Sequence, residues 1–296
     1  MSHVKRFRGS LIVLLVFPLT CIGEARADPT VAPSQSPTPV IRELQDFTGD
    51  GKADFAVWRP STGEWWIRGK TPVRWGRDGD IPVPADYDHD GLADLAVWRP
   101  STGVWWIKGS RGGSRTVRWG LKDDVPIPAR ELSCGWGSPL LTVWRPSSAT
   151  WWVLSEGGIT CRKQLGKAGD VPNLGSYGID ACARYGYAVW RPSNGTFYSY
   201  SYYGGEVQLG RQGDIPLPPL FGDGCHGNVP AVWRPSNGTW YDSDNLGSPV
   251  QWGQQGDIPV PGVAGRLYAV WRPSTGMWWV KGQANIRWGK RGDVPV

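Results

Sequence analysis

The sequence predicts an all-β fold, a β-propeller of six four-stranded blades, and three observations lead to it. The 296 residues include 20 Trp, 41 Gly and 26 Pro, and no segment shows the apolar period of an amphipathic helix. The tripeptide Trp-Arg-Pro occurs six times. A second motif, Trp/Leu-Gly, three residues, then Asp-Ile/Val-Pro, follows each copy. This strict alternation indicates six copies of one unit, each about the size of a four-stranded blade. The tripeptides begin at Trp58, Trp98, Trp144, Trp190, Trp233 and Trp271.

The residues before the repeats read as an export signal and a tether. Residues 1–27 have basic residues at the start, an apolar stretch and then Ala25-Arg26-Ala27, which is the pattern of a cleaved signal peptide. Residues 28–40 are rich in Pro, Ser and Thr and are predicted to be an extended linker. The repeats fill residues 41–296. We therefore expect a secreted protein, extracellular or periplasmic.

The charge pattern argues against two classes of partner. The formal net charge is +6, and about half of it lies in residues 1–27. The remaining charges are scattered, so the basic stripe of a nucleic-acid-binding protein is missing. The apolar stretch is short and contains Pro18, so stable membrane insertion is not expected either.

The second repeat shows how each unit divides into strands. Residues 81–86, 95–99, 104–108 and 116–119 are predicted as four strands, with the turn Pro-Ser-Thr-Gly between the second and third. Proline cannot donate to a ladder, so the Ile-Pro-Val-Pro strand is expected at a sheet edge.

The closure of the ring is predicted from the two ends of the repeat region. The predicted first strand of the first unit, residues 41–46, lacks the Pro-Val-Pro pattern, whereas the chain ends on an unpaired Asp-Val-Pro-Val. The terminal strand is therefore predicted to pair with the first blade. A β-solenoid and a seven-bladed ring with one degenerate blade are the alternatives.

Two acidic loops carry the clearest chemistry. Residues 46–54 and 86–94 both fit Asp-x-Asp/Thr-x-Asp-Gly-x-x-Asp. Oxygen ligands at alternate positions, a bending glycine and a closing carboxylate suit a hard cation, so the sequence predicts two Ca²⁺ ions. The alternative is an Asx-rich turn that binds nothing. The predicted ligands are Asp46, Thr48, Asp50, Asp54 and the Lys52 carbonyl for one ion, and Asp86, Asp88, Asp90, Asp94 and the Leu92 carbonyl for the other.

With these loops ahead of short apolar strands, the repeats resemble the FG-GAP/VCBS family, the blades of integrin-α-type propellers. The resemblance covers residues 41–296 as architecture, but the acidic loop is present only in the first two units. It implies a secreted, bacterial-type binding or adhesion module, some related propellers being lectins.

Four cysteines remain after signal cleavage, and an even number in an exported chain favours two disulfides. Three of them fall where the later units have lost the acidic loop. We predict Cys134–Cys161 and Cys182–Cys225, one of three connectivities.

Two sets of residues recur in every unit and have two interpretations each. The Arg of Trp-Arg-Pro and the Asp of Asp-Ile/Val-Pro could form bidentate pairs, or the arginines could form a ring that recognises an anion. The aromatic pairs after each turn could be core between blades or platforms for sugars. They are Trp65-Trp66, Trp105-Trp106, Trp151-Trp152, Phe197-Tyr198, Trp240-Tyr241 and Trp278-Trp279.

The sequence holds no recognisable catalytic motif. The expected function is a non-catalytic module that binds an extracellular glycan or protein partner. A glycan-cleaving hydrolase or lyase on the same scaffold is the alternative.

Overall fold

The structure of the chain is a computed structural model, and it describes residues 45–128, 139–175, 186–200, 205–221, 228–243, 248–261 and 268–296. All of these belong to one compact unit of the chain, Pro37–Val296. The predicted signal peptide and linker lie outside the described residues.

The described residues form 24 strands and one short 3₁₀ turn. The strands of the first three blades are β1 (Ala56–Arg59), β2 (Glu64–Ile67), β3 (Val73–Arg74), β4 (Ile81–Pro82), β5 (Leu95–Arg99), β6 (Val104–Lys108), β7 (Ser114–Arg118), β8 (Val125–Ile127), β9 (Pro139–Arg145), β10 (Thr150–Ser155) and β11 (Thr160–Gln164), with η1 (Glu156–Gly158) before β11. The remaining strands are β12 (Val171–Leu174), β13 (Tyr187–Arg191), β14 (Thr196–Ser199), β15 (Gly205–Gln208), β16 (Ile215–Phe221), β17 (Asn228–Arg234), β18 (Thr239–Asp242), β19 (Val250–Gln251), β20 (Ile258–Pro259), β21 (Ala269–Arg272), β22 (Met277–Val280), β23 (Ile286–Arg287) and β24 (Val294–Pro295).

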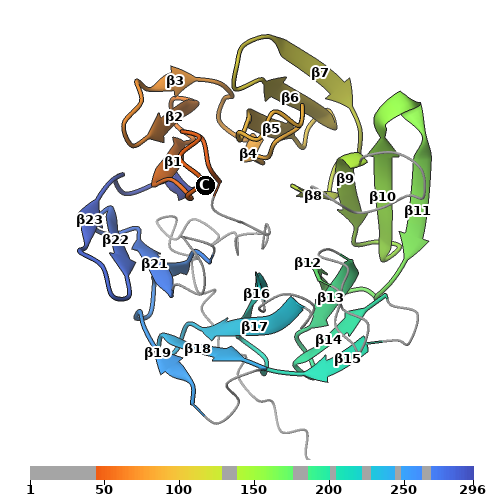
Figure 1. Cartoon of the computed structure of the whole chain (residues 1–296). Coiled ribbons are helices and arrows are strands. Elements are labelled where there is room, and N and C mark those ends of the chain that lie inside the picture. Colours follow the sequence, from red (N-terminus) through yellow and green to blue (C-terminus); the bar gives the residue numbers. More distant parts are fainter. Residues whose placement is uncertain are drawn as a thin grey trace, which may run out of the picture. The chain divides into compact units, whose positions relative to one another are not determined.

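These strands make six four-stranded antiparallel sheets, which confirms the predicted six-bladed β-propeller. Figure 1 shows the blades around a ring, with β4, β8, β12 and β16 nearest its centre and β3, β7, β11 and β15 at its rim. The innermost strands are the Ile/Val-Pro strands. Their prolines therefore lie at a sheet edge, where a missing N–H breaks no ladder.

The ring closes by pairing the two ends of the repeat region. The C-terminal strand β24 is the innermost strand of the first blade, in the order β24-β1-β2-β3. Val57 pairs with Pro295 and Trp58 with Val294, and the Val296 N–H donates to the Ala56 carbonyl at 3.1 Å. The predicted closure is confirmed. The strand expected from residues 41–46 is not the innermost strand of that blade, because β24 holds that position.

The core lies between blades. Each of six apolar clusters combines residues from two neighbouring blades, including the junction of the last blade with the first. In every blade the first residue of the recurring aromatic pair is at most 2% exposed. The second is half-buried. The aromatic pairs therefore serve as core between blades.

The recurring Arg and Asp form the predicted bidentate pairs. In all six, Nε and Nη2 of the arginine donate to the two carboxylate oxygens over 2.7 to 3.0 Å. Each guanidinium also stacks on the second aromatic residue of its blade, 4.1 to 5.0 Å from the ring centroid. Because the edge of each guanidinium binds an aspartate and its face stacks on an aromatic ring, these arginines have a structural role. The pairs are Arg59–Asp293, Arg99–Asp80, Arg145–Asp124, Arg191–Asp170, Arg234–Asp214 and Arg272–Asp257.

Tryptophan N–H groups tie neighbouring blades together. Trp75 Nε1 donates to the Trp106 carbonyl of the next blade at 3.0 Å, and Trp288 Nε1 donates across the closing junction to the Trp66 carbonyl at 2.9 Å. Two repeats carry Leu165 and Leu209 at this position and so have no indole donor there.

The hairpin turn of each blade yields a first prediction. Gly103 has φ +65°, and a Cβ there would lie 2.3 Å from the Gly120 carbonyl oxygen. The third repeat carries Ala149 at the equivalent position, also with a positive φ, 49°. We expect Gly103→Ala to lower the free energy of unfolding by more than ~2 kcal/mol, and Ala149→Gly to raise it by about 0.5–1 kcal/mol. Urea denaturation of the two variants checks this; equal losses in both would contradict it.

Candidate metal centre

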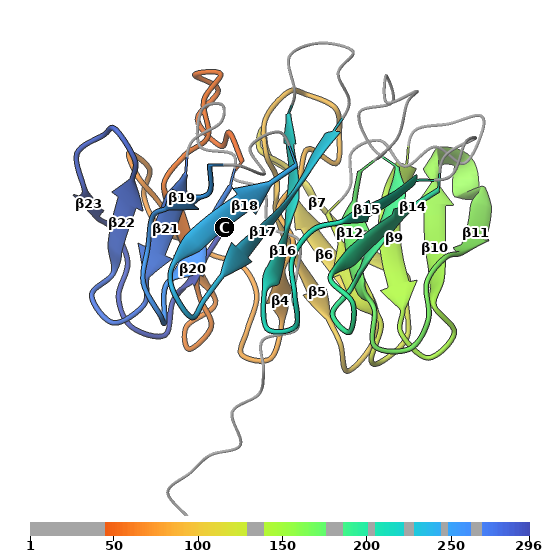
Figure 2. The ribbon, with the colours of Figure 1, turned by 90° about the horizontal axis from the view of Figure 1, so that it is seen from below.

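The two acidic loops occupy equivalent positions in the first and second blades. The loop of residues 86–94 lies between β4 and β5, and its ends are joined by an isolated bridge between Ala85 and Asp94. The loop of residues 46–54 precedes β1, where the Asp54 N–H donates to the Gln45 carbonyl at 2.9 Å. In Figure 2 this orange loop extends beyond the edges of the strands.

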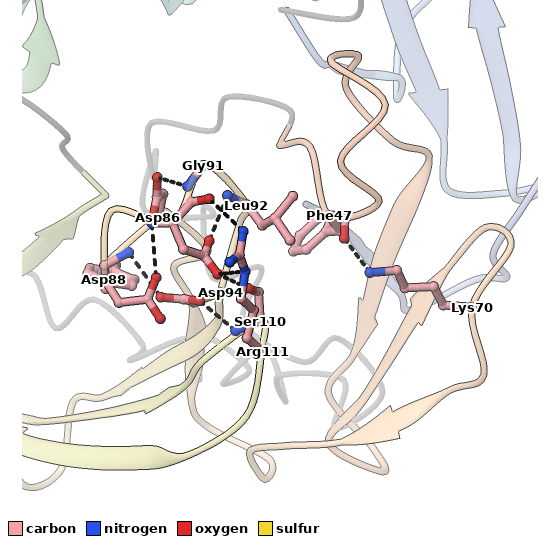
Figure 3. Close-up of polar contacts among 11 residues, drawn as sticks. Phe47, Lys70, Asp86, Asp88, Gly91, Leu92, Asp94, Ser110 and Arg111 are labelled. Carbon is pink, nitrogen blue, oxygen red and sulfur yellow. Dashed lines mark hydrogen bonds and ion pairs between the residues drawn. The ribbon is translucent and has the colours of Figure 1, made fainter.

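Three of the predicted ligands come together in the second loop. Asp86, Asp88 and Asp90 each place one carboxylate oxygen within 4.8 Å of the others. Asp86 is buried, Asp88 is exposed and Asp90 is intermediate, so the cluster opens toward solvent on one side. Figure 3 shows Asp86 and Asp88 in this loop. These oxygens are close enough to share one cation.

Backbone N–H groups donate to all three of these carboxylates, and Asp88 accepts from the Asp90 N–H at 3.3 Å. Asp86 accepts from the Gly91 N–H at 3.0 Å and from the Asp90 N–H at 3.1 Å. The positive φ of Gly91, +88°, gives the loop its bend. Asp90 accepts from the Leu92 N–H at 2.8 Å. The alternation of Asp with bending residues therefore builds the cluster locally.

Asp94, the predicted closing ligand, has a different position. It is 1% exposed, and its two oxygens accept from the Tyr87 N–H at 3.0 Å and from the Ser110 N–H at 2.8 Å. Its burial raises the pKa of the Asp94 carboxyl, and the charges of Asp88 and Asp86 add to that rise. Asp94 thus fastens the loop to the neighbouring turn, outside the three-carboxylate cluster.

Sequence reasoning missed two residues that contact the cluster through Asp90. They lie in the turn between β6 and β7, where Ser110 Oγ donates to Asp90 at 2.6 Å and Arg111 Nε lies 3.0 Å from the same carboxylate oxygen. The Ser110 hydroxyl, the Leu92 N–H and the Arg111 guanidinium together lower the pKa of Asp90. The long, glycine-rich segment of residues 109–113 in this repeat was the available signal.

The first loop differs from the second. Thr48 stands where the second loop has an acid, and its hydroxyl donates to Asp54 at 3.0 Å. Asp46 accepts the Gly49 and Gly51 N–H groups at 2.6 and 2.9 Å, and Asp50 accepts the Lys52 N–H at 2.9 Å. Within the described residues, only the second loop gathers three carboxylates at metal-binding distance. Calcium in the first loop stays a prediction.

The two loops touch each other. The Ala93 N–H of the second loop donates to the Asp46 carbonyl of the first at 2.8 Å. A Cβ added at Gly49 would lie 2.9 Å from Leu92 Cδ2, so the loops are packed side by side. An ion bound in one loop would therefore also restrain the loop that packs against it.

The cysteine predictions fall mostly outside the described residues. Cys134, Cys182 and Cys225 lie there, as do the segments of the later repeats that correspond to the acidic loops. Cys161, in β11, is disulfide-bonded. The predicted pairing stays a prediction.

Comparisons with known proteins found matches among solved structures alone. No protein-family model and no curated protein matches the chain, so membership of the FG-GAP/VCBS family stays a prediction. Among solved structures, a streptogramin B lyase matches with a TM-score of 0.47 and 10% identity over 81% of this chain and 84% of that one. Virginiamycin B lyase from Staphylococcus aureus matches with a TM-score of 0.48 and 10% identity over 86% and 88%. BBS1N, in its complex with ARL6DN, matches with a TM-score of 0.45 and 14% identity over 84% and 80%.

These matches correct one expectation from the sequence. The chain was expected not to be an enzyme, yet the solved structures that it matches include lyases, which are enzymes on a propeller scaffold. The missing catalytic motifs do not exclude catalysis, because motifs are family-specific and one fold hosts many chemistries.

No helix among the described residues is long and apolar enough to cross a membrane.

Proposed function

We propose that this chain is a secreted propeller that binds Ca²⁺ in the loop of residues 86–94. A second ion binds in the loop of residues 46–54. The end of the ring that carries both loops is the surface on which the protein binds an extracellular glycan or protein partner. The proposal includes three points from the sequence: membership of the FG-GAP/VCBS family, a cleaved signal peptide in residues 1–27 and an extended linker in residues 28–40.

The observation that carries the calcium proposal is the cluster of Asp86, Asp88 and Asp90. Ca²⁺ binds oxygen ligands at about 2.3–2.6 Å, so two oxygens on opposite sides of one ion are about 5 Å apart. The oxygens of the cluster, all within 4.8 Å of one another, agree with that spacing. The donors of the cluster are carboxylate oxygens, which suit Ca²⁺ better than a softer metal.

Charge supports the same conclusion. The cluster brings three carboxylates together, and Arg111, whose side chain is 72% exposed, forms an ion pair with Asp90. One exposed guanidinium offsets at most one of three negative charges. A divalent ion would supply the rest. The millimolar affinity typical of extracellular calcium modules suffices for a secreted protein.

A glycan-cleaving hydrolase or lyase on the same scaffold is the second candidate. Binding and cleavage would both use a surface groove that recognises the sugar, so the same assay addresses both. A glycan array read with calcium and then with chelator tests the binding proposal, and release of shorter sugars from a bound polysaccharide would identify the enzyme.

Calcium should stabilise the protein. With calcium at 100 times its dissociation constant, we expect the free energy of unfolding to rise by about 2.7 kcal/mol. Asp88→Asn removes an exposed ligand with little effect on folding, and it should weaken calcium binding more than tenfold. The measurement is thermal unfolding of chelated protein titrated with calcium.

The matched control for this titration is Asp78→Asn. Asp78 is also an exposed aspartate, but it lies in the turn before β4 and belongs to neither acidic loop. Its variant should respond to calcium as the unaltered protein does. If the melting temperature of the unaltered protein did not move with calcium, the calcium proposal would be refuted.

A further inference from the structure

A groove lies between the first two blades, beside the acidic loops. It has a volume of about 340 Å³. Ile67 in β2, Val73 in β3 and Leu95 in β5 give it an apolar wall, and Phe47 and Ala93 from the two acidic loops extend that wall. This volume lies within the range of sites for small molecules.

The polar groups of the groove are cationic or hydroxylic. Lys70, from the turn between β2 and β3, lies on one side, and Lys108 at the end of β6 lies on the other blade. Thr71 and Ser110 add two hydroxyl groups. Among the described residues that line the groove none is acidic, so the lining carries two positive charges. A ligand with a negative charge complements it.

Both lysines are positioned by the fold. The Lys70 ammonium donates to the Phe47 carbonyl of the first acidic loop, and Figure 3 shows this contact. The Lys108 ammonium lies 5.7 Å from the centroid of the Trp75 ring, and Lys108 is half-buried. Each contact leaves ammonium hydrogens for a further acceptor, since a lysine has three.

Hydrogen bonds connect the walls of the groove to the proposed calcium loop. Ser110 lines the groove and also binds Asp90 and Asp94 through its hydroxyl and its N–H. Ala93 lines the groove and joins the two loops through the Asp46 carbonyl. An ion among Asp86, Asp88 and Asp90 would therefore order one wall of the groove.

We propose that this groove binds a carboxylated sugar, a uronic-acid residue of an acidic glycan. The C–H face of the ring packs on Ile67, Val73 and Leu95, and the sugar hydroxyls bond to Thr71 and Ser110. The carboxylate lies between Lys70 and Lys108. The inference rests on the proposed binding function and names its ligand class. An apolar wall with hydroxyl and ammonium groups at its rim matches a ring that has both apolar faces and a polar edge.

The test uses the full mature protein with saturating calcium and three probes at low salt: glucuronate, glucose and hexanoate. Chemical-shift titration should show glucuronate binding at least tenfold more tightly than either glucose or hexanoate. Replacing both lysines, Lys70→Gln with Lys108→Gln, should reduce glucuronate affinity at least tenfold, whereas Lys122→Gln, a change at an exposed lysine outside the groove, should leave it unchanged.

Each other outcome overturns the proposal. No glucuronate binding, equal binding of glucose, or unchanged affinity in the double lysine variant would show that no carboxylated sugar is recognised here. Tighter binding of hexanoate would replace the sugar by an aliphatic acid. The calcium-induced shift in melting temperature is measured on the same samples, so a failure of the groove and a failure of the calcium site are distinguished.

Discussion

Deleting the last four residues, Asp293–Val296, is expected to open the ring and to leave little of the protein in its native fold. These residues include β24, which supplies the innermost strand of the first blade and pairs with β1. Its loss exposes the edge of β1, and an unpaired edge of apolar residues is a site for aggregation.

The deletion also removes the partner of Arg59. That side chain is 11% exposed and is bonded to Asp293 through Nε and Nη2. Leaving one member of a buried ion pair without its partner costs about 3–5 kcal/mol, a large part of the 5–15 kcal/mol that stabilises a typical domain. Val296, 3% exposed, adds the loss of a buried side chain, about 1.5–2 kcal/mol.

Urea denaturation and size-exclusion chromatography measure this effect. The matched control removes Val296 alone, because Val294 and Pro295 then still pair with β1. The control should stay monodisperse and lose only the cost of one buried side chain. A four-residue deletion with an unchanged urea midpoint would show that closure through β24 does not hold the ring.

The Arg–Asp pairs give the second large effect. Arg99→Leu is expected to lower the free energy of unfolding by about 3–5 kcal/mol, because it leaves the Asp80 carboxylate, 1% exposed, without its cation. The hydrogen bonds to Asp80 raise the pKa of Arg99, which agrees with a pair that is stabilised in its charged form. The arginine also loses its stacking on Trp106, 4.8 Å away.

A double-mutant cycle separates the pair from other losses. Asp80→Asn is combined with Arg99→Leu, and the double variant should lose less than the sum of the two single variants, since neither stranded charge is then present. Arg111→Leu in calcium-free buffer is the control. It breaks an ion pair whose arginine is 72% exposed, so its loss should be much smaller than that of Arg99→Leu. Additive losses in the cycle would contradict a coupled pair.

Much of the fold was predictable because each blade repeats the same packing problem. The Trp-Arg-Pro strand and the aromatic strand are buried or ion-paired in every blade, and their predicted ranges in the second repeat, residues 95–99 and 104–108, coincide with β5 and β6. The first strand was predicted too long. Regular pairing ends at Pro82, because Pro84 has no N–H to donate. Beyond it, the Val83 N–H donates to the Ala96 carbonyl at 2.9 Å, and Ala85 forms an isolated bridge with Asp94.

Of the candidate site, only the residues that lie within one loop were predicted. The positions of Asp86, Asp88 and Asp90 follow from one short loop, so their spacing in the sequence was enough to place them together. Ser110 reaches Asp90 from 20 residues away, and Lys70 reaches Phe47 from 23 residues away. Contacts of that kind depend on how blades and turns meet, which no local pattern records.

The most direct test of the calcium site is a crystal structure of the protein grown with millimolar calcium, with the ion located by its anomalous scattering. The proposal predicts one ion with oxygens of Asp86, Asp88 and Asp90 at about 2.3–2.6 Å. An intact second blade with no ion among these three carboxylates would contradict it.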